Sequence, residues 1–272
     1  MKLLRKLGEG GYAAVHECRD VSSGKLYACK VFEKATTTRF QVIKEAGIHR
    51  RVYQSQTSGK IAGFVNLTED DDTFKIVMEL CEGGHVACTR GGYAPRQARE
   101  IVRGTLEGLM DVHRCGIIHR DIKHANILLK DDRVKIADFG TSVYFHPSAD
   151  KDTGKQDVFM TTNDIKGTPR FLSPEALRHE CMFTTDVWCV GVLAYQLMTG
   201  EFPFEDTGNR TNPSLNAIVR SIMEDAPAFG HGAWRAGNRD AIDFVECCLI
   251  KSPLDRPSVA ECLEHPWMRD GE

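Results

Sequence analysis

The sequence predicts a mixed α+β fold of two lobes, in which a small antiparallel-sheet lobe with one main helix precedes a larger helical lobe. Three observations lead to this prediction. Strand patterns dominate up to about residue 80, Gly83 and Gly84 then break the pattern, and helical spacing dominates after residue 173. We therefore expect one domain with a first lobe at about residues 1–82 and a second at about 83–272.

The first lobe contains two clear strand patterns with a helical pattern between them. The stretch KLYACKVF alternates in polarity, and TFKIVMEL is a half-buried apolar run. Between them, TRFQVIKEAGIHRRV carries apolar residues and a glycine at helical spacing: Phe40, Ile43, Gly47, Ile48 and Val52. This order predicts a sheet with one helix.

The second lobe is expected to be mainly helical. Pro95 suits a helix N-terminus, and apolar residues recur every three or four positions from there to Gly116. Two short strands, NILLK and RVKIADF, follow around a turn at Asp131 and Asp132. Further helices are predicted near 184–199, 213–224, 238–250 and 257–265. The long segment 141–166 has no periodicity, which is typical of functional or disordered loops.

Composition excludes several classes of protein. The chain has 272 residues, of which 42% are hydrophobic and 27% charged, and a formal net charge of -3, so we expect no nucleic-acid partner and no membrane partner. Its ten cysteines are scattered, which favours reduced core thiols. The start, MKLLRKLGEGG, reaches Arg5 before an apolar region develops, so no signal peptide is predicted. We expect an intracellular, cytoplasmic protein, with the nucleus as an alternative.

One polar cluster, in GIIHRDIKHANILL, stands between two apolar runs. It could be an ordinary polar loop. It could also be a site in which the apolar flanks hold five polar side chains together, and these side chains are His119, Arg120, Asp121, Lys123 and Asn126. The rest of the chain decides between the two interpretations.

A glycine-rich turn and a lysine precede this cluster. In LGEGGYAAV, Gly8, Gly10 and Gly11 would let backbone N–H groups approach phosphate oxygens, although most glycine-rich hairpins have no such role. In YACK, Lys30 lies on an apolar strand face, where an ammonium needs anionic partners unless it reaches solvent at an edge. Glu45 on the following helix is a candidate partner.

The stretch KIADFG supplies a candidate metal ligand. Asp138 ends a buried strand, and a carboxylate there suits Mg²⁺, which prefers oxygen ligands shared with substrate phosphates. Asn126 offers a neutral oxygen for the same ion. A single aspartate after a strand is more often a turn residue, so the order of all these pieces carries the argument.

That order, from glycine-rich turn to strand lysine, helix glutamate, His-Arg-Asp loop and Asp-Phe-Gly, resembles the eukaryotic protein kinase family over Leu7 to about Trp267. The resemblance implies the kinase fold, with an activation segment at 138–175, and an ATP-dependent phosphorylation with Mg²⁺. It implies an ATP site formed by Leu7, Gly8, Glu9, Gly10, Val15, Ala28, Lys30, Glu45, Met78, Glu79, Cys81 and Leu128. In it, Lys30 paired with Glu45 would hold the α- and β-phosphates, Met78 would border the adenine, and Glu79 and Cys81 would present backbone groups to the base.

The resemblance also implies catalytic and structural roles. Asp121 would accept or orient the substrate hydroxyl proton, Lys123 would steady the γ-phosphate, and Asn126 and Asp138 would bind Mg²⁺. In GTPRFLSPE, a peptide-docking segment, Glu175 would pair with Arg256, and Asp186 would brace the catalytic loop. Four residues, Leu67, His49, Phe139 and His119, would stack as a spine between the lobes. A histidine is unusual at position 49, and we expect it to loosen that stack.

Lys123 together with Thr168 resembles the serine/threonine class, because both would pack against Asp121 and shape a shallow site for a short hydroxyl side chain. Other stretches, VMELCEGG and EHPWM among them, are most similar to calcium/calmodulin-dependent and calcium-dependent protein kinases. The chain has no calcium-binding loop motif, and the residues after Trp267 are too few for a calmodulin-binding helix. Calcium regulation is therefore expected only through elements absent from this chain, which we expect to be a monomer.

Departures from the family pattern concern substrate choice and activation. Three positions where arginine-directed members carry acids hold His85, Ala125 and Gln196, so we expect no strong arginine requirement. Thr161 and Thr162 are candidate phosphosites. Asp164 is a built-in carboxylate that we expect to pair with Arg120 and to give activity without phosphorylation.

Two other functions stay open at this point. A pseudokinase scaffold that binds partners or nucleotide without catalysis is suggested by Ala13, where the third glycine of the family falls, and by His49. A small-molecule or lipid phosphotransferase would not be expected to carry GTPRFLSPE. The filled catalytic positions favour an active protein kinase.

Overall fold

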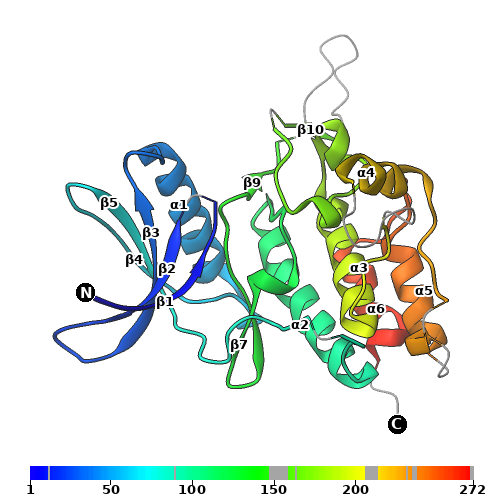
Figure 1. The fold of residues 1–272 in the computed structure, drawn as a ribbon, viewed down its shortest axis with the longest axis horizontal. Helices are drawn as coiled ribbons and strands as arrows, with labels where there is room; N and C mark the ends of the chain where they lie inside the picture. The colour runs from blue at the N-terminus through cyan, green and yellow to red at the C-terminus, as the bar shows by residue number, and fades with distance from the viewer. Residues whose placement is uncertain are drawn as a thin grey trace.

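The protein is described here from a computed structural model covering residues 1–11, 13–88, 90–146, 159–162, 164–205, 214–230, 232–234 and 238–269. The predicted α+β class is confirmed. A sheet lobe and a helical lobe lie side by side, with the N-terminus in the first and the C-terminal helices in the second (Figure 1).

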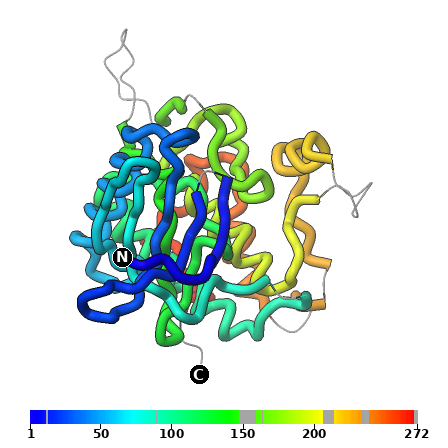
Figure 2. Tube along the Cα trace, turned by 60° about the vertical axis from the view of Figure 1, so that its left-hand side comes forward, coloured from blue at the N-terminus to red at the C-terminus, as the bar shows by residue number. Residues whose placement is uncertain are grey.

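The first lobe is an antiparallel sheet with one helix against it. Its strands, in spatial order, are β1 (Lys2–Glu9), β2 (Ala14–Arg19), β3 (Leu26–Glu33), β5 (Thr73–Met78) and β4 (Phe64–Glu69), and they run side by side in Figure 2. Helix α1 (Arg39–Ser55) begins at a capping box, in which the Thr38 side chain accepts from Gln41 N and Gln41 Oε1 accepts from Thr38 N. The predicted helix is confirmed, but Phe40 is 76% exposed and Ile43 is 44% exposed.

The second lobe contains five α-helices among the described residues: α2 (Pro95–Arg114), α3 (Phe183–Thr199), α4 (Leu215–Glu224), α5 (Arg239–Cys248) and α6 (Val259–Glu264). Short 3-10 turns connect them: η1 (His124–Asn126), η2 (Pro169–Phe171), η3 (Ala176–Arg178), η4 (Gly232–Trp234) and η5 (Pro266–Met268). In the described parts of the chain, no helix combines the length and apolar character needed to cross a membrane.

Three two-stranded ladders bring loops of the second lobe together. Strand β6 (Ile117–Ile118) pairs with β9 (Val143–Tyr144), β7 (Ile127–Lys130) with β8 (Arg133–Ile136), and β10 (Met160–Thr161) with β11 (Glu180–Cys181). The predicted turn between β7 and β8 is present, and Asp131 and Asp132 both adopt positive φ, at 48° and 58°. Aspartate tolerates this conformation better than most residues.

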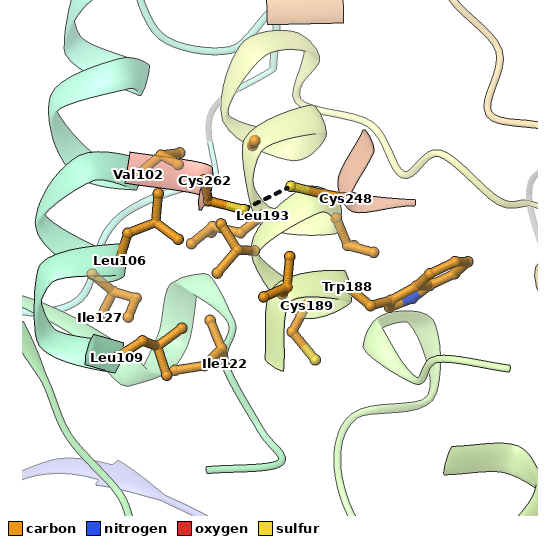
Figure 3. Close-up of a cluster of buried hydrophobic side chains, with 14 of the residues drawn as sticks. Val102, Leu106, Leu109, Ile122, Ile127, Trp188, Cys189, Leu193, Cys248 and Cys262 are labelled. Carbon is orange, nitrogen blue, oxygen red and sulfur yellow. Dashed lines mark hydrogen bonds between the residues drawn. The ribbon is translucent and has the colours of Figure 1, made fainter. Parts of the chain in front are cut away.

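The core of the second lobe lies between α2 and α3. Leu106 and Leu109 of α2 point towards Leu193 of α3 in Figure 3, and all three are fully buried. A Cβ atom on Gly191 would lie 2.6 Å from Cys248 Cβ, so this glycine lets α3 approach α5 closely. All ten cysteines are free thiols, as the sequence predicts.

The connection between α1 and β4, residues 56–63, fastens the first lobe to the second. Ala62 N donates to Ile136 O at 2.9 Å, and Ile136 N donates to Lys60 O at 2.7 Å. Near its start, the carboxylate of Asp111 on α2 accepts from the backbone N–H groups of Thr57 and Ser58. These bonds fix the α1–β4 connection on β8 and α2.

A buried ion pair joins the residue before η3 to the connection between α5 and α6. Arg256 Nη1 and Nη2 donate to the two carboxylate oxygens of Glu175 at 2.8 and 3.2 Å, and both side chains are at most 1% exposed. Arg256 also donates to the Thr184 and Ile250 carbonyls. The bidentate contact between Glu175 and Arg256 agrees with the pairing that the resemblance implies.

We predict that Arg256→Leu lowers the free energy of unfolding by about 3 to 5 kcal/mol, because it leaves the Glu175 carboxylate buried without its partner. Urea denaturation followed by circular dichroism measures this loss. Arg96→Leu is the matched control, since its pair with Glu100 is 83% and 61% exposed. Equal urea midpoints for the two variants would contradict the prediction.

Candidate active site

The carboxylate of Asp121 lies at the centre of the polar cluster. Its Oδ1 accepts from the backbone N–H and from the hydroxyl of Thr168, both at 3.0 Å. Its Oδ2 lies 2.7 Å from Lys123 Nζ and accepts from Asn126 Nδ2 at 3.0 Å. Lys123 Nζ also donates to Thr168 Oγ1 at 2.6 Å. The structure therefore brings these four residues together as the sequence predicts.

Asp186 fixes the loop that carries Asp121. Its carboxylate accepts from the backbone N–H groups of His119 at 2.9 Å and Arg120 at 2.8 Å, and it lies 2.9 Å from His113 Nε2. Arg120 has a φ of 69°, which is strained for a residue with a side chain. Asp186 is fully buried; burial works against its charge, but the hydrogen bond from His113 and the other donors lower its pKa.

Lys30, Glu45 and Asp138 form a second charged group opposite the loop. Lys30 Nζ donates to Glu45 Oε1 at 2.6 Å and to Asp138 Oδ1 at 2.8 Å. Burial disfavours the Lys30 ammonium, but the two carboxylates raise its pKa above the ordinary value. The surrounding protein partly desolvates Asp138, yet the Lys30 charge lowers the pKa of Asp138 to about 2. Both groups are therefore charged at neutral pH, as a phosphate and metal site requires.

Asn126 and Asp138 together can hold a divalent cation. The amide nitrogen of Asn126 donates to Asp121 O and Oδ2, which turns the amide oxygen away from Asp121. Asp138 uses Oδ1 for Lys30 and for Gly140 N, which leaves Oδ2, and its side chain is 45% exposed. Two hard oxygen donors in this arrangement fit Mg²⁺.

The glycine-rich turn lies between β1 and β2. Gly8 pairs with Val15 across the hairpin, Glu9 pairs with Ala14, and Gly10 N donates to Ala13 O at 2.9 Å. A Cβ atom on Gly8 would meet nothing within 4 Å, so the space beside this glycine is open. Leu7 is 39% exposed on the same strand. The Glu9 side chain bonds to Lys6, a contact that the sequence did not reveal.

The residues expected to border the adenine lie at the end of β5, just after it, and on β3 and β7. Met78 at the end of β5 and Cys81 shortly after it are buried, as is Ala28 on β3, while Leu128 on β7 is half-buried. These positions agree with walls of a nucleotide site.

Glu79 in that segment is already bonded on two sides. Its backbone N–H donates to Gly63 O at 2.7 Å, so its carbonyl is the group that remains for a base. Its side chain accepts from Gly63 N at 3.0 Å and lies 2.8 Å from Lys130 Nζ. Sequence reasoning missed Gly63 and Lys130, since no local pattern marks a contact between residues so far apart.

The expected spine is present in part, and His49 stacks within it. The Phe139 ring contacts both histidines. The His49 ring stacks on it with centroids 5.0 Å apart, and the centroid of the His119 ring lies 5.1 Å from that of Phe139. His49 Nε2 lies 2.7 Å from Ala62 O. Leu67 packs against the core of the first lobe. Burial lowers the pKa of His49 from its ordinary value of 6.5 to about 4, so the imidazole is neutral at physiological pH.

This depressed pKa predicts an acid-sensitive fold. Above pH 6.5 both the folded and unfolded states hold a neutral His49, and as the pH falls the unfolded state takes up the proton first. Between pH 6.5 and 4, the wild-type protein should lose about 3 kcal/mol more unfolding free energy than His49→Leu. Urea titrations of both proteins across this range measure the difference, and parallel curves would contradict it.

The activation segment places a carboxylate beside Arg120, as predicted. Arg120 Nη2 donates to Asp164 O at 3.1 Å and lies 3.6 Å from Asp164 Oδ1. Both residues line a cavity of about 420 Å³ together with Lys44 and Lys166. Burial lowers the pKa of Lys44; the Arg120 charge lowers it further, and the Asp164 carboxylate opposes both.

Of the two candidate phosphosites, Thr161 is exposed in β10. Thr162 is hydrogen-bonded within the protein. Its N–H and its hydroxyl both donate to His179 O, and the hydroxyl also donates to Asp164 O. Residues 147–158 and 163 of the same segment lie outside the described residues. Thr161 is therefore the more accessible of the two hydroxyl groups.

The three substituted positions lie near the catalytic loop. His124 Nδ1 and Gln196 Oε1 are 3.1 Å apart, and the ring of His85 lies 6.5 Å from that of His124. Ala125 lies between His124 and Asn126 in η1. No carboxylate occupies these three positions, in agreement with the sequence analysis.

The sequence matches the family described as Protein kinase domain over residues 1–268. Calcium-dependent protein kinase 29 of Arabidopsis thaliana is 32% identical over 276 residues, which cover 98% of this chain and 48% of that protein. Calcium-dependent protein kinase 24 of Arabidopsis thaliana is 32% identical over 98% of this chain and 44% of its own length. Calcium-dependent protein kinase 8 of Oryza sativa subsp. japonica is 30% identical, with 98% and 48% covered. The chain spans about half the length of these curated relatives.

Proposed function

Since the chain belongs to the protein kinase domain family, we propose that it transfers the γ-phosphate of ATP to serine or threonine hydroxyl groups of protein substrates. The observation that carries the proposal is the contact of Asp121 with both Lys123 and Thr168. By the family resemblance, this contact would shape a shallow site that suits a short hydroxyl side chain. The names of the calcium-dependent relatives support the same class of reaction.

In the proposed reaction, Asp121 orients the substrate hydroxyl and accepts its proton, while Lys123 neutralises charge on the transferred phosphoryl group. Lys30, held by Glu45, binds the α- and β-phosphates. Asn126 and Asp138 hold Mg²⁺, which when bound neutralises phosphate charge. The protein contributes mainly positioning and charge, because phosphoryl transfer requires little covalent chemistry from it.

We predict that Asp121→Asn lowers kcat for phosphate transfer to a serine peptide by about 10² to 10⁴-fold, since the amide cannot accept the proton. Transfer from radiolabelled γ-phosphate ATP measures it, with threonine and tyrosine versions of the peptide as the specificity test. Titration of ATP binding checks that the variant is folded. A scaffold without catalysis predicts no difference between the two proteins, and phosphorylation of tyrosine alone would overturn the serine/threonine assignment.

We further propose that Asp164 supplies the negative charge that Arg120 needs, so that the protein is active without phosphorylation. The distances from Arg120 to Asp164 support this. Regulation by calcium would act through segments outside this sequence, and a monomeric, cytoplasmic protein remains our expectation.

Protein produced in bacteria, with absence of phosphate checked by mass spectrometry, should therefore phosphorylate the peptide. Asp164→Ala should lower kcat by at least about tenfold, because the loop loses its contact with Arg120. Thr161→Ala, which removes the exposed hydroxyl and keeps Asp164, should retain activity. If the unphosphorylated wild-type protein is inactive and becomes active on phosphorylation of Thr161, Asp164 does not replace a phosphate.

We also propose that substrates need no arginine near the acceptor, because the positions of His85, Ala125 and Gln196 offer no carboxylate to pair with it.

A further inference from the structure

Three side chains of types that bind metals lie together in the second lobe, on elements that the candidate active site does not use. Asp243 and Cys247 are four residues apart on α5, so both lie on the same face of that helix. His265 lies between α6 and η5, and η5 packs against α5. A carboxylate oxygen, a sulfur and a ring nitrogen from these residues all lie within 4.8 Å of one another. The fold therefore gathers three different metal-binding groups from two separate segments.

Packing fixes the direction of the His265 ring. The ring meets the buried ring of Phe244 edge-on, with centroids 5.4 Å apart. Its Nδ1 accepts from Trp267 N at 3.2 Å, and its Nε2 lies 3.1 Å from Asp243 Oδ2. Because Nδ1 accepts, Nε2 carries the ring proton. A metal bound at Nε2 would move this proton to Nδ1, and the single bond from Trp267 N would be lost.

A cavity beside these groups gives room for a further ligand. Its volume is about 420 Å³, and Cys247 and His265 both line it. The Asp243 side chain is 66% exposed, whereas the His265 side chain is only 13% exposed. A metal between them would therefore be reached from solvent, and a water molecule would complete a four-coordinate shell.

The donor atoms select the class of metal. A thiolate and an imidazole favour Zn²⁺ over Mg²⁺ and Ca²⁺, which prefer oxygen ligands. In a tetrahedral zinc site, bonds of about 2.0 to 2.3 Å separate the ligand atoms by about 3.3 to 3.8 Å. The 3.1 Å between His265 Nε2 and Asp243 Oδ2 is close to this separation, and the limit of 4.8 Å for the whole group exceeds it only slightly. Small side-chain movements are therefore enough to form the site.

We propose that Asp243, Cys247 and His265 form a zinc site, with a water molecule from the cavity as the fourth ligand. On binding, the Cys247 thiol loses its proton, since the thiolate is the form that coordinates a metal. The bound ion fastens α5 to the residue that joins α6 to η5. The site is independent of the proposed phosphate transfer. The alternative is a purely structural contact between Asp243 and His265, in which Cys247 takes no part.

Metal titration of the whole chain tests the site, after chelation has removed bound metals and with the thiols kept reduced. The probes are ZnCl₂ and, as a coloured substitute, CoCl₂. Wild-type protein should bind a single zinc ion, and its cobalt form should show the thiolate-to-cobalt charge-transfer absorption that reports a metal–sulfur bond. Zinc should also raise the melting temperature, because it binds the folded state.

Cys247→Ala should weaken zinc binding by at least about 100-fold and abolish the charge-transfer absorption, because loss of a ligand costs more than loss of an outer hydrogen-bond partner. Asp243→Asn changes an exposed side chain, so the fold is retained, and it should weaken zinc binding by about tenfold or more. Cys88→Ala is the matched control, since it removes an exposed thiol elsewhere on the chain. It should bind zinc as the wild-type protein does.

Three results would overturn the site. They are the absence of zinc binding to the wild-type protein, a cobalt complex without the charge-transfer absorption, and wild-type zinc affinity in Cys247→Ala or Asp243→Asn. Loss of the absorption in Cys88→Ala would place the metal elsewhere and would equally contradict the proposal. Circular dichroism without metal checks that each variant is folded.

Discussion

The buried carboxylate of Asp186 is the interaction on which the arrangement of the site depends. It accepts two consecutive backbone N–H groups, those of His119 and Arg120, at a point where Arg120 has a left-handed backbone. Such a conformation costs about 1 to 3 kcal/mol for a residue with a side chain. Two hydrogen bonds to a charged acceptor, each about 1.5 to 3 kcal/mol, are enough to offset that cost. The next residue is Asp121, so its direction follows from this turn.

The same turn determines how the activation segment approaches. A Cβ atom on Gly167 would lie 2.8 Å from Arg120 O, and Gly167 has a φ of 117°, so only glycine lets the segment pass at this distance. The close approach brings the N–H and hydroxyl of Thr168 to Asp121. The catalytic loop, which Asp186 holds through its backbone, and the segment 167–168 therefore contact each other through backbone atoms as well as side chains.

Much of this could be predicted from the sequence where the signal is local. Regular spacing located α2 and α3, and paired aspartates located the turn at Asp131 and Asp132. The pairing of Lys30 with Glu45 could be inferred because a buried ammonium needs an anion and few candidates lie nearby in the chain.

What the sequence could not supply are contacts that depend on how elements pack. Helical spacing identified α1, but it could not show that Phe40 and Ile43 face outward, because that depends on which side of the helix meets the sheet. The contact of His49 with Ala62 O was not predicted, since an isolated residue gives no information about the carbonyl it will meet. The engagement of Glu79 with Gly63 and Lys130 was missed for the same reason.

The charge around Arg120 concerns how the activation segment is held against the catalytic loop. Asp164 contributes one negative charge to a cavity bordered by Arg120, Lys44 and Lys166, whereas a phosphate would contribute about 1.5 to 2. Burial is the largest cause of the lowered pKa of Lys44, and the Arg120 charge adds to it. The contact of His49 Nε2 with Ala62 O also involves α1, and it requires no added charge.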